Sequence, residues 1–215
     1  MRSWWTWCPT SQGALQNAEA RILSFIKTKF EDTTVQISNN NKINTVCINT
    51  EMGKRHIPLV MMHGFGSGIA LWVRNLDSLS KSRPLYCFDL LGFGRSSRPR
   101  LSNKAEIVEA QFVESVEEWR KAVGLNSFIL LGHSLGGYLA AAYALRYPSR
   151  VKQLILADPW GFPQRPTTSD LSRRPRVPVW IRAIVFLMQP FNPLAILRAA
   201  GPWGMPAHAF VSVLV

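Results

Sequence analysis

The segment G-H-S-L-G at residues 132–136 holds the residue types and spacing best suited to chemistry in this chain. Its serine, Ser134, follows an apolar run at 128–131 and precedes a helical pattern at 135–147. A serine on a tight strand-to-helix turn exposes its hydroxyl, and glycines two positions away on either side let strand and helix approach closely. The pattern therefore predicts a nucleophilic Ser134 beside a helix N-terminus, whose positive potential favours an oxyanion.

A second glycine-rich segment, H-G-F-G-S-G at residues 63–68, directly follows the apolar run 57–62. Glycines in such a turn expose backbone N–H groups, and acyl transfer needs two of these donors to converge on a carbonyl oxygen. We expect the amides of Phe65 and Leu135 to be that pair. The alternative is a tight turn without a catalytic role, and in either case His63 is better suited to a structural hydrogen bond than to general-base work.

A third segment, D-L-L-G-F-G-R-S at residues 89–96, closes the next predicted strand. We expect Asp89 to be structural and its glycines to form a turn near the same edge of the sheet. The G-x-G lacks the rest of a dinucleotide fingerprint, so no nucleotide cofactor is predicted.

A serine nucleophile needs a base and an acid, which follow it in the order Ser, Asp or Glu, His in this arrangement. Beyond Ser134 the sequence contains only Asp158, Asp170 and His208 as candidates. Asp158 ends the apolar run 151–157 and could be an off-position acid, although a role in its turn is the favoured interpretation. No strand pattern returns His208 to the sheet, so we expect an impaired catalyst.

The elements that must position these groups alternate between strand and helix. Short, nearly continuous apolar runs are typical of strands covered on both faces, and their alternation with helices predicts a mostly parallel α/β sheet with crossover helices. An amphipathic helix and a β-hairpin are expected before them. The expected strands are 33–37, 43–48, 57–62, 85–88, 128–131 and 151–157, and the expected helices are 12–30, 71–79, 104–123, 135–147, 179–188 and 194–199.

Composition narrows the class of protein further. With 215 residues and 47% apolar composition the chain is predicted to be globular, and its apolar stretch at 183–188 is far shorter than the roughly 20 residues of a membrane span. No secretory signal is recognised at the start. The cysteines, Cys8, Cys47 and Cys87, have no C-x-x-C spacing, which favours reduced thiols inside the cell over a zinc or disulfide scaffold. No metal site is expected.

Two segments favour contact with lipid. Trp4, Trp5 and Trp7 are suited to a headgroup boundary, although a helix packed on the domain is the simpler role for the segment that follows. The basic region after residue 160 includes Arg173, Arg174 and Arg176, which suit phospholipid headgroups or a phosphate-bearing substrate. Its alternative is a solvated linker. The formal charge of +12 comes without a nucleic-acid recognition module, so nucleic acid is not expected as a partner.

Several longer stretches resemble one subfamily of the α/β-hydrolase fold that handles lipids. The subfamily contains a lysophospholipase of N-acyl phosphatidylethanolamines and the lipid-droplet co-activator of adipose triglyceride lipase, which is also credited with lysophosphatidic acid acyltransferase activity. The stretches that carry the resemblance are 4–11, 85–99, 111–120, 131–151, 154–166 and 191–204.

The resemblance implies a lipid-metabolism hydrolase or acyltransferase, peripheral on lipid droplets or membranes in the cytoplasm, without a cofactor. Its implied partners are a phospholipid or droplet surface, a triglyceride lipase and a droplet coat protein. By this resemblance we expect a Trp-rich segment with an amphipathic helix at 1–30, a hydrolase core at 31–159 and a basic lid-like region with a divergent tail at 160–215.

Two departures from the subfamily separate the hypotheses. The co-activator branch typically carries Asn at the nucleophile position, where this chain has Ser134, so the branch stays open. After residue 204 the subfamily continues through further strands, the triad acid and an H-x-x-x-x-D motif that residues 205–215 do not match. We therefore expect a truncated isoform or gene model without the last strands, leaving 151–157 as an exposed edge. The alternative to an enzyme is a non-catalytic co-regulator of a triglyceride lipase.

Overall fold

A computed structural model describes residues 11–54 and 56–162, and residues 10–163 form one compact unit. Several expectations lie outside the described residues. These are the lipid-facing roles of Trp4, Trp5, Trp7, Arg173, Arg174 and Arg176, the helices at 179–188 and 194–199, and the candidates Asp170 and His208.

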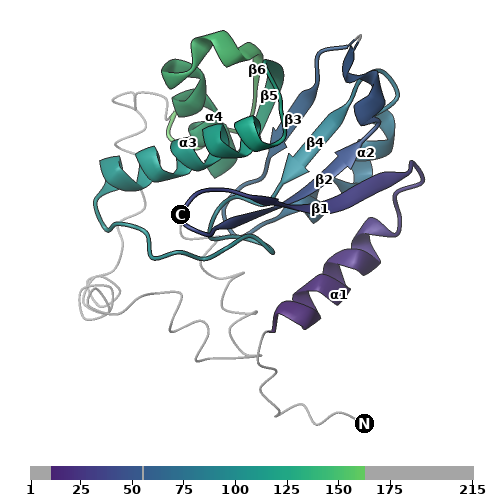
Figure 1. Cartoon of the computed structure of the whole chain (residues 1–215), viewed down its shortest axis with the longest axis horizontal. Coiled ribbons are helices and arrows are strands. Elements are labelled where there is room, and N and C mark those ends of the chain that lie inside the picture. Colours follow the sequence, from purple (N-terminus) through teal and green to yellow (C-terminus); the bar gives the residue numbers. More distant parts are fainter. Residues whose placement is uncertain (1–10, 55, 163–215) are drawn as a thin grey trace, which may run out of the picture. The chain divides into compact units, whose positions relative to one another are not determined.

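The described residues form a six-stranded sheet in the order β1-β2-β4-β3-β5-β6 (Figure 1). The pairs β1–β2 and β2–β4 are antiparallel, and the other pairs are parallel. This confirms the predicted α/β class with a mostly parallel sheet. The strands are β1 (Phe30–Gln36), β2 (Lys42–Ile48), β3 (Leu59–Met62), β4 (Leu85–Phe88), β5 (Phe128–His133) and β6 (Val151–Ala157).

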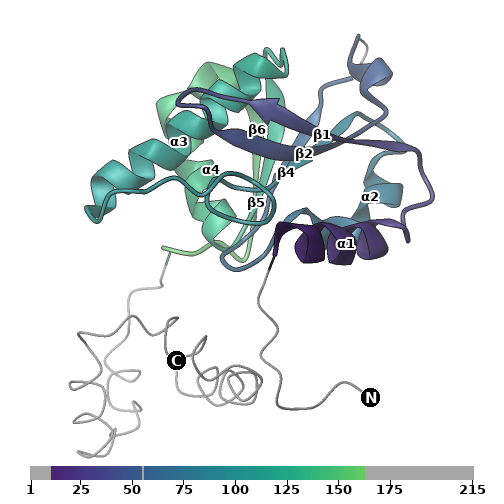
Figure 2. The same ribbon diagram turned by 60° about the horizontal axis from the view of Figure 1, so that its bottom comes forward.

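Within the described part of the chain, four α-helices cover the two faces of this sheet (Figure 2). Helices α3 and α4 pack with one apolar cluster, whereas α1 and α2 pack with the other. Alternate residues of the central strands serve the two clusters: Val60 belongs to the first and Met61 to the second. The helices are α1 (Gln12–Leu23), α2 (Val73–Leu79), α3 (Ala105–Ala122) and α4 (Leu135–Arg146), with 3₁₀ turns at Thr50–Lys54, Ile69–Trp72 and Pro148–Arg150.

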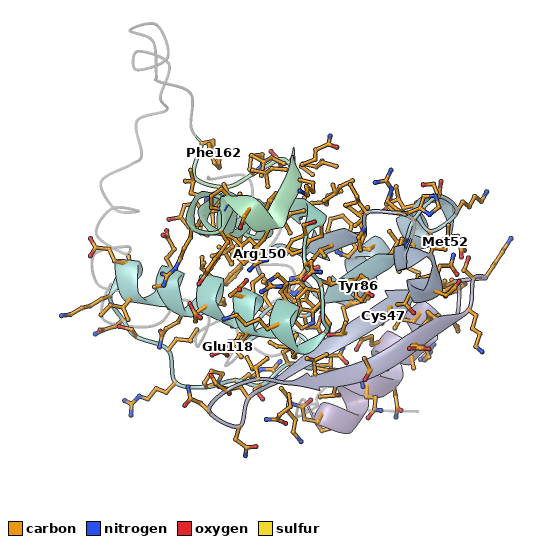
Figure 3. The ribbon with its side chains drawn as sticks, turned by 45° about the horizontal axis from the view of Figure 1, so that its top comes forward. Cys47, Met52, Tyr86, Glu118, Arg150 and Phe162 are labelled. Atoms are coloured by element: carbon orange, nitrogen blue, oxygen red, sulfur yellow. The ribbon has the colours of Figure 1, made fainter. Side chains whose placement is uncertain are left out.

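The predicted hairpin is confirmed by the antiparallel pair β1–β2. On its other side β2 pairs with β4, where Cys47 lies opposite Tyr86 (Figure 3). Cys47 and Cys87 are both buried and free. Burial raises the pKa of the Cys47 thiol to about 12, so it stays protonated at neutral pH. These two cysteines are therefore packing residues of the sheet.

The helix predicted at 12–30 ends earlier, at Leu23. The Asp77 carboxylate of α2 accepts hydrogen bonds from the backbone N–H groups of Lys27 and Thr28, at 3.1 and 2.8 Å. From Phe30 onward the chain pairs with β2 instead. The apolar residues after Leu23 continue the helical spacing, but they lie in the turn that follows α1 and at the start of the edge strand β1.

Residues 151–157 form an exposed edge strand, as the departure from the subfamily predicts, and not a strand covered on both faces as the apolar run alone suggested. Strand β6 is the last of the sheet, and Ile155 and Leu156 are 36% and 37% exposed. Among the described residues no strand pairs with its outer edge. An apolar edge of this kind is a template for pairing with another chain. In the part of the chain that the structure describes, no helix has the length and apolar character needed to cross a membrane.

Candidate active site

Ser134 lies on the sharp turn between β5 and α4, with φ 53° and ψ −119°. A positive φ is unfavourable for a non-glycine residue and persists only where the surroundings impose it. The end of β6 imposes it here: the Ser134 N–H donates to the Ala157 carbonyl at 3.2 Å, and the Trp160 N–H donates to the Ser134 carbonyl at 2.9 Å. The predicted elbow is thus held on both sides by backbone hydrogen bonds.

The flanking glycines are required because three backbone segments touch at this turn. A Cβ on Gly132 would overlap the backbone of Gly136, and a Cβ on Gly136 would overlap the carbonyl oxygens of Met62 and His63. The first turn of α4 therefore rests directly on the ends of β5 and β3. This packing explains the spacing of the G-x-S-x-G motif in steric terms.

The loop at 63–68 runs beside the serine. A Cβ on Gly64 would come within 2.9 Å of the Ser134 Cβ. The backbone N–H groups of Phe65 and Leu135 donate no hydrogen bond within the described residues, and Leu135 is the first residue of α4. Among the described residues, nothing therefore competes with an oxyanion for these two amides. Their convergence on one oxygen stays a prediction.

His63 has both ring nitrogens occupied by backbone groups. Nε2 accepts from the Leu90 N–H at 3.0 Å, so Nδ1 carries the proton and donates to the Gly64 carbonyl at 2.8 Å. Burial lowers the pKa of His63 and keeps the ring neutral. Its contacts match the structural role anticipated from the sequence, and it has no free nitrogen to deprotonate Ser134.

Asp89 joins the loops around the site. Its buried carboxylate accepts from the Ile69 and Arg95 backbone N–H groups, each at 2.8 Å, and from Asn44 Nδ2 at 3.0 Å. A buried carboxylate is stable only when its oxygens are satisfied in this way. These contacts match the structural role expected of Asp89.

Glu19 is a buried polar residue that the sequence reasoning missed. It is 7% exposed on α1, and its carboxylate lies 3.4 Å from Arg95 Nη1 and 3.4 Å from Asn44 Nδ2. Burial, together with the nearby Asp89 charge, raises the pKa of Glu19 to about 7 although Arg95 opposes the shift. The sequence offered one indication of this burial, namely that Glu19 lies four residues before Leu23 and so on the same face of the helix.

No described histidine is hydrogen-bonded to the Ser134 hydroxyl. His133 Nδ1 is buried without a hydrogen-bond partner in the described chain, and its ring lies edge-on to Trp72 with centroids 6.4 Å apart. His56 lines a cavity of about 510 Å³ near the amino ends of β3 and β5, at the opposite edge of the sheet. Within residues 11–54 and 56–162 the Ser134 hydroxyl therefore has no histidine hydrogen-bonded to it.

Asp158 follows β6 directly, as expected, and adopts a positive φ of 46°. Aspartate tolerates this conformation better than most residues. Its side chain is exposed and makes no hydrogen bond to another described residue. The geometry suits the turn role better than that of a triad acid.

Comparison with known proteins identifies a family and several relatives that this chain resembles. Residues 57–187 match the model of the α/β hydrolase fold family. The chain is 56% identical over 196 residues to the pig 1-acylglycerol-3-phosphate O-acyltransferase ABHD5, covering 91% of this chain and 55% of that protein. It is 54% identical over 195 residues to the human (lyso)-N-acylphosphatidylethanolamine lipase, covering 91% and 56%.

Among solved structures, a bacterial membrane phospholipase A matches with a TM-score of 0.59 and 27% identity, covering 94% of this chain and 65% of that one. The chain spans about half the length of the two curated relatives it matches.

Proposed function

This chain belongs to the α/β hydrolase fold family, and from that premise we propose that it acts on acyl-glycerophospholipids, as a lysophospholipase or an acyltransferase. The observation that carries the proposal is the strained Ser134 turn, beside the backbone amides of Phe65 and Leu135, which donate to no other described residue. The lipid specificity is supported by the names of the relatives, an acylglycerophosphate acyltransferase and an N-acylphosphatidylethanolamine lipase.

In the proposed reaction the Ser134 oxygen attacks the carbonyl carbon of an acyl ester. The Oγ–C bond forms while the amides of Phe65 and Leu135 hold the oxyanion, and the ester C–O bond then breaks. The glycerol oxygen leaves with a proton, and the acyl group passes from Ser134 to water or to an acceptor hydroxyl. The Ser134 proton needs an acceptor, and no described histidine is hydrogen-bonded to the Ser134 hydroxyl.

We propose further that this 215-residue chain is catalytically impaired. His208, the one histidine that follows Ser134 in the sequence, is not expected to reach the serine. Without an imidazole the proton passes to solvent, and serine hydrolases lacking triad members retain only about 10³ to 10⁴ of rate enhancement over water.

The site of action in this proposal is a cytoplasmic lipid-droplet or membrane surface. Trp4, Trp5 and Trp7 would sit at the headgroup boundary, and Arg173, Arg174 and Arg176 would face anionic headgroups. A triglyceride lipase or a droplet coat protein is the proposed protein partner, and no nucleic acid or cofactor is included.

A second candidate is a non-catalytic co-regulator of a triglyceride lipase. It is favoured by one observation, namely that His63 has both nitrogens bound and His133 makes no hydrogen bond to Ser134. The fold and its lipid surface would then serve recruitment alone.

Reaction of the purified 215-residue protein with a fluorophosphonate separates these functions. The impaired enzyme is expected to label slowly at Ser134 and not at all in the Ser134→Ala variant, with slow release of fatty acid from a lysophospholipid. Rapid labelling would contradict the impairment. Release of no fatty acid above the Ser134→Ala background would contradict the enzyme and leave the co-regulator.

A further inference from the structure

Helix α1 carries more apolar surface than its packing uses. It buries Glu19 and Leu23 against the domain, whereas Leu15 and Ile22 are 37% and 41% exposed. Phe25, which lies in the turn after the helix, is 77% exposed. We call Leu15, Ile22 and Phe25 the α1 stripe. The spacing of its members, seven and then three residues, places them along one side of the segment, next to the buried side.

The stripe is held in a fixed orientation. Glu19 ties the middle of the helix to Arg95 and Asn44, and Asp77 receives the backbone N–H groups of Lys27 and Thr28 just beyond its end. Because these anchors lie on either side of Ile22, the exposed side chains cannot turn inward without breaking them. Their exposure is therefore a feature of the folded unit.

The segment's own exposed charges are all positive, although the Asp77 carboxylate of α2 lies against the backbone of Lys27 and Thr28. Between residues 11 and 30 Glu19 is the single acidic residue, and it is buried. The exposed cations Arg21, Lys27 and Lys29 lie within four residues of Ile22 or Phe25 in the sequence. Apolar side chains flanked by basic residues fit a surface with an apolar interior and anionic headgroups, and basic residues add attraction to such a leaflet.

The helix also borders the candidate active site. Its Glu19 meets Arg95 in the loop after β4, and α1 contacts the 3₁₀ turn Ile69–Trp72 that follows the 63–68 loop. Figure 2 shows α1 alongside α2 on this flank of the sheet. A surface that touched α1 would thus adjoin the edge where Ser134 lies.

We propose that the α1 stripe, with Arg21, Lys27 and Lys29, is a docking surface for an anionic phospholipid bilayer. The proposal rests on the proposed action on phospholipids and assigns the contact to residues of the folded unit. Phe25 and Ile22 insert between headgroups, and the three cations pair with lipid phosphates.

Flotation of the full chain with phosphatidylcholine vesicles containing phosphatidylserine tests this. The Ile22→Ser, Phe25→Ser double variant is expected to bind at least about tenfold more weakly, because it removes the largest exposed apolar groups of the stripe. Replacing Arg21, Lys27 and Lys29 by Gln is expected to remove most of the difference between vesicles with and without phosphatidylserine.

The chain offers a matched control in Ile57 and Leu145, which are 45% and 85% exposed. They lie on other elements, before β3 and in the last turn of α4. The Ile57→Ser, Leu145→Ser variant should float as the wild type does. Far-ultraviolet circular dichroism and thermal unfolding verify that each variant is folded.

Equal flotation of the stripe variant and the wild type overturns the proposal. So does an equal loss in the control variant, since binding would then follow total apolar surface. A change in sedimentation of the stripe variant without a change in flotation would assign the stripe to a protein contact and also overturn it. Hydrolysis of a monomeric short-chain ester, measured in parallel, reports on the Ser134 chemistry alone and so separates failure of the docking surface from failure of the proposed function.

Discussion

The two loops that meet at Ser134 are held by different forces. The turn at 132–136 is fixed by backbone contact across its glycines and by backbone hydrogen bonds to the end of β6. The loop at 63–68 is fixed by buried polar side chains, chiefly His63 and Asp89. Steric contact is insensitive to pH and fails abruptly, whereas a polar network weakens in steps and titrates.

The largest effect should come from Gly136→Ala. The new Cβ would overlap the His63 and Met62 carbonyl oxygens, so the β3, β5 and α4 junction must separate. We expect a loss of more than about 4 kcal/mol in unfolding free energy, measured by urea denaturation. The control is Gly13→Ala, where nothing lies within 4 Å and a gain of about 0.5–1 kcal/mol is expected from helix propensity. A small loss of unfolding free energy in Gly136→Ala would contradict the claim that backbone contact holds the turn at 132–136.

Asp89→Ala should cost less, about 2–4 kcal/mol, because it leaves the Ile69 and Arg95 N–H groups without an acceptor. Asp89→Asn keeps one acceptor oxygen and should recover part of the loss. Hydrogen exchange of the Ile69 and Arg95 amides reports the effect directly. If both variants exchanged as slowly as the wild type, the 63–68 loop would not depend on its polar network.

Ser134→Gly should act in the opposite direction. Glycine adopts the positive φ at this position without strain, so unfolding free energy should rise by about 1–2 kcal/mol while fluorophosphonate labelling disappears. Ser134→Ala removes the hydroxyl but keeps the strain, and serves as the comparison. Equal stability of the two variants would show that the turn is not strained by the serine Cβ.

The smallest effect is the pH dependence that Glu19 contributes. Its pKa is raised from 4.5 to about 7 on folding, so the folded chain binds this proton more tightly and stability falls as pH rises from 4.5 through 7. Between pH 6 and 7 the fall should be below about 1 kcal/mol, since Arg95 compensates part of the charge. Glu19→Gln should flatten the profile of thermal midpoint against pH.

His63 shifts in the other direction. Burial lowers its pKa, so its contribution to stability is present above pH 6.5 and is lost as pH falls below that value. If the Glu19→Gln variant still loses stability on acidification, that loss can be assigned to His63 and not to Glu19. A wild-type profile without either slope would contradict the titratable half of the comparison.

The sequence by itself determined the local elements and the nucleophile turn. Residues 85–88 and 151–157 form the predicted strands, and Ser134 lies on the predicted turn, because apolar periodicity and the need for glycine at 132 and 136 are carried by neighbouring residues. The structural roles expected of His63 and Asp89 also followed from local context, namely their positions at strand ends.

Only the tertiary structure decided the rest. It ended α1 at Leu23, beyond which Asp77 accepts from the backbone of Lys27 and Thr28, and it buried Glu19 against Arg95, which is 76 residues away in the chain. It also showed that the His63 ring is occupied and that the α1 stripe faces outward. Burial, pairing and exposure depend on which distant segments contact each other, and the spacing of residues along the chain does not determine those contacts.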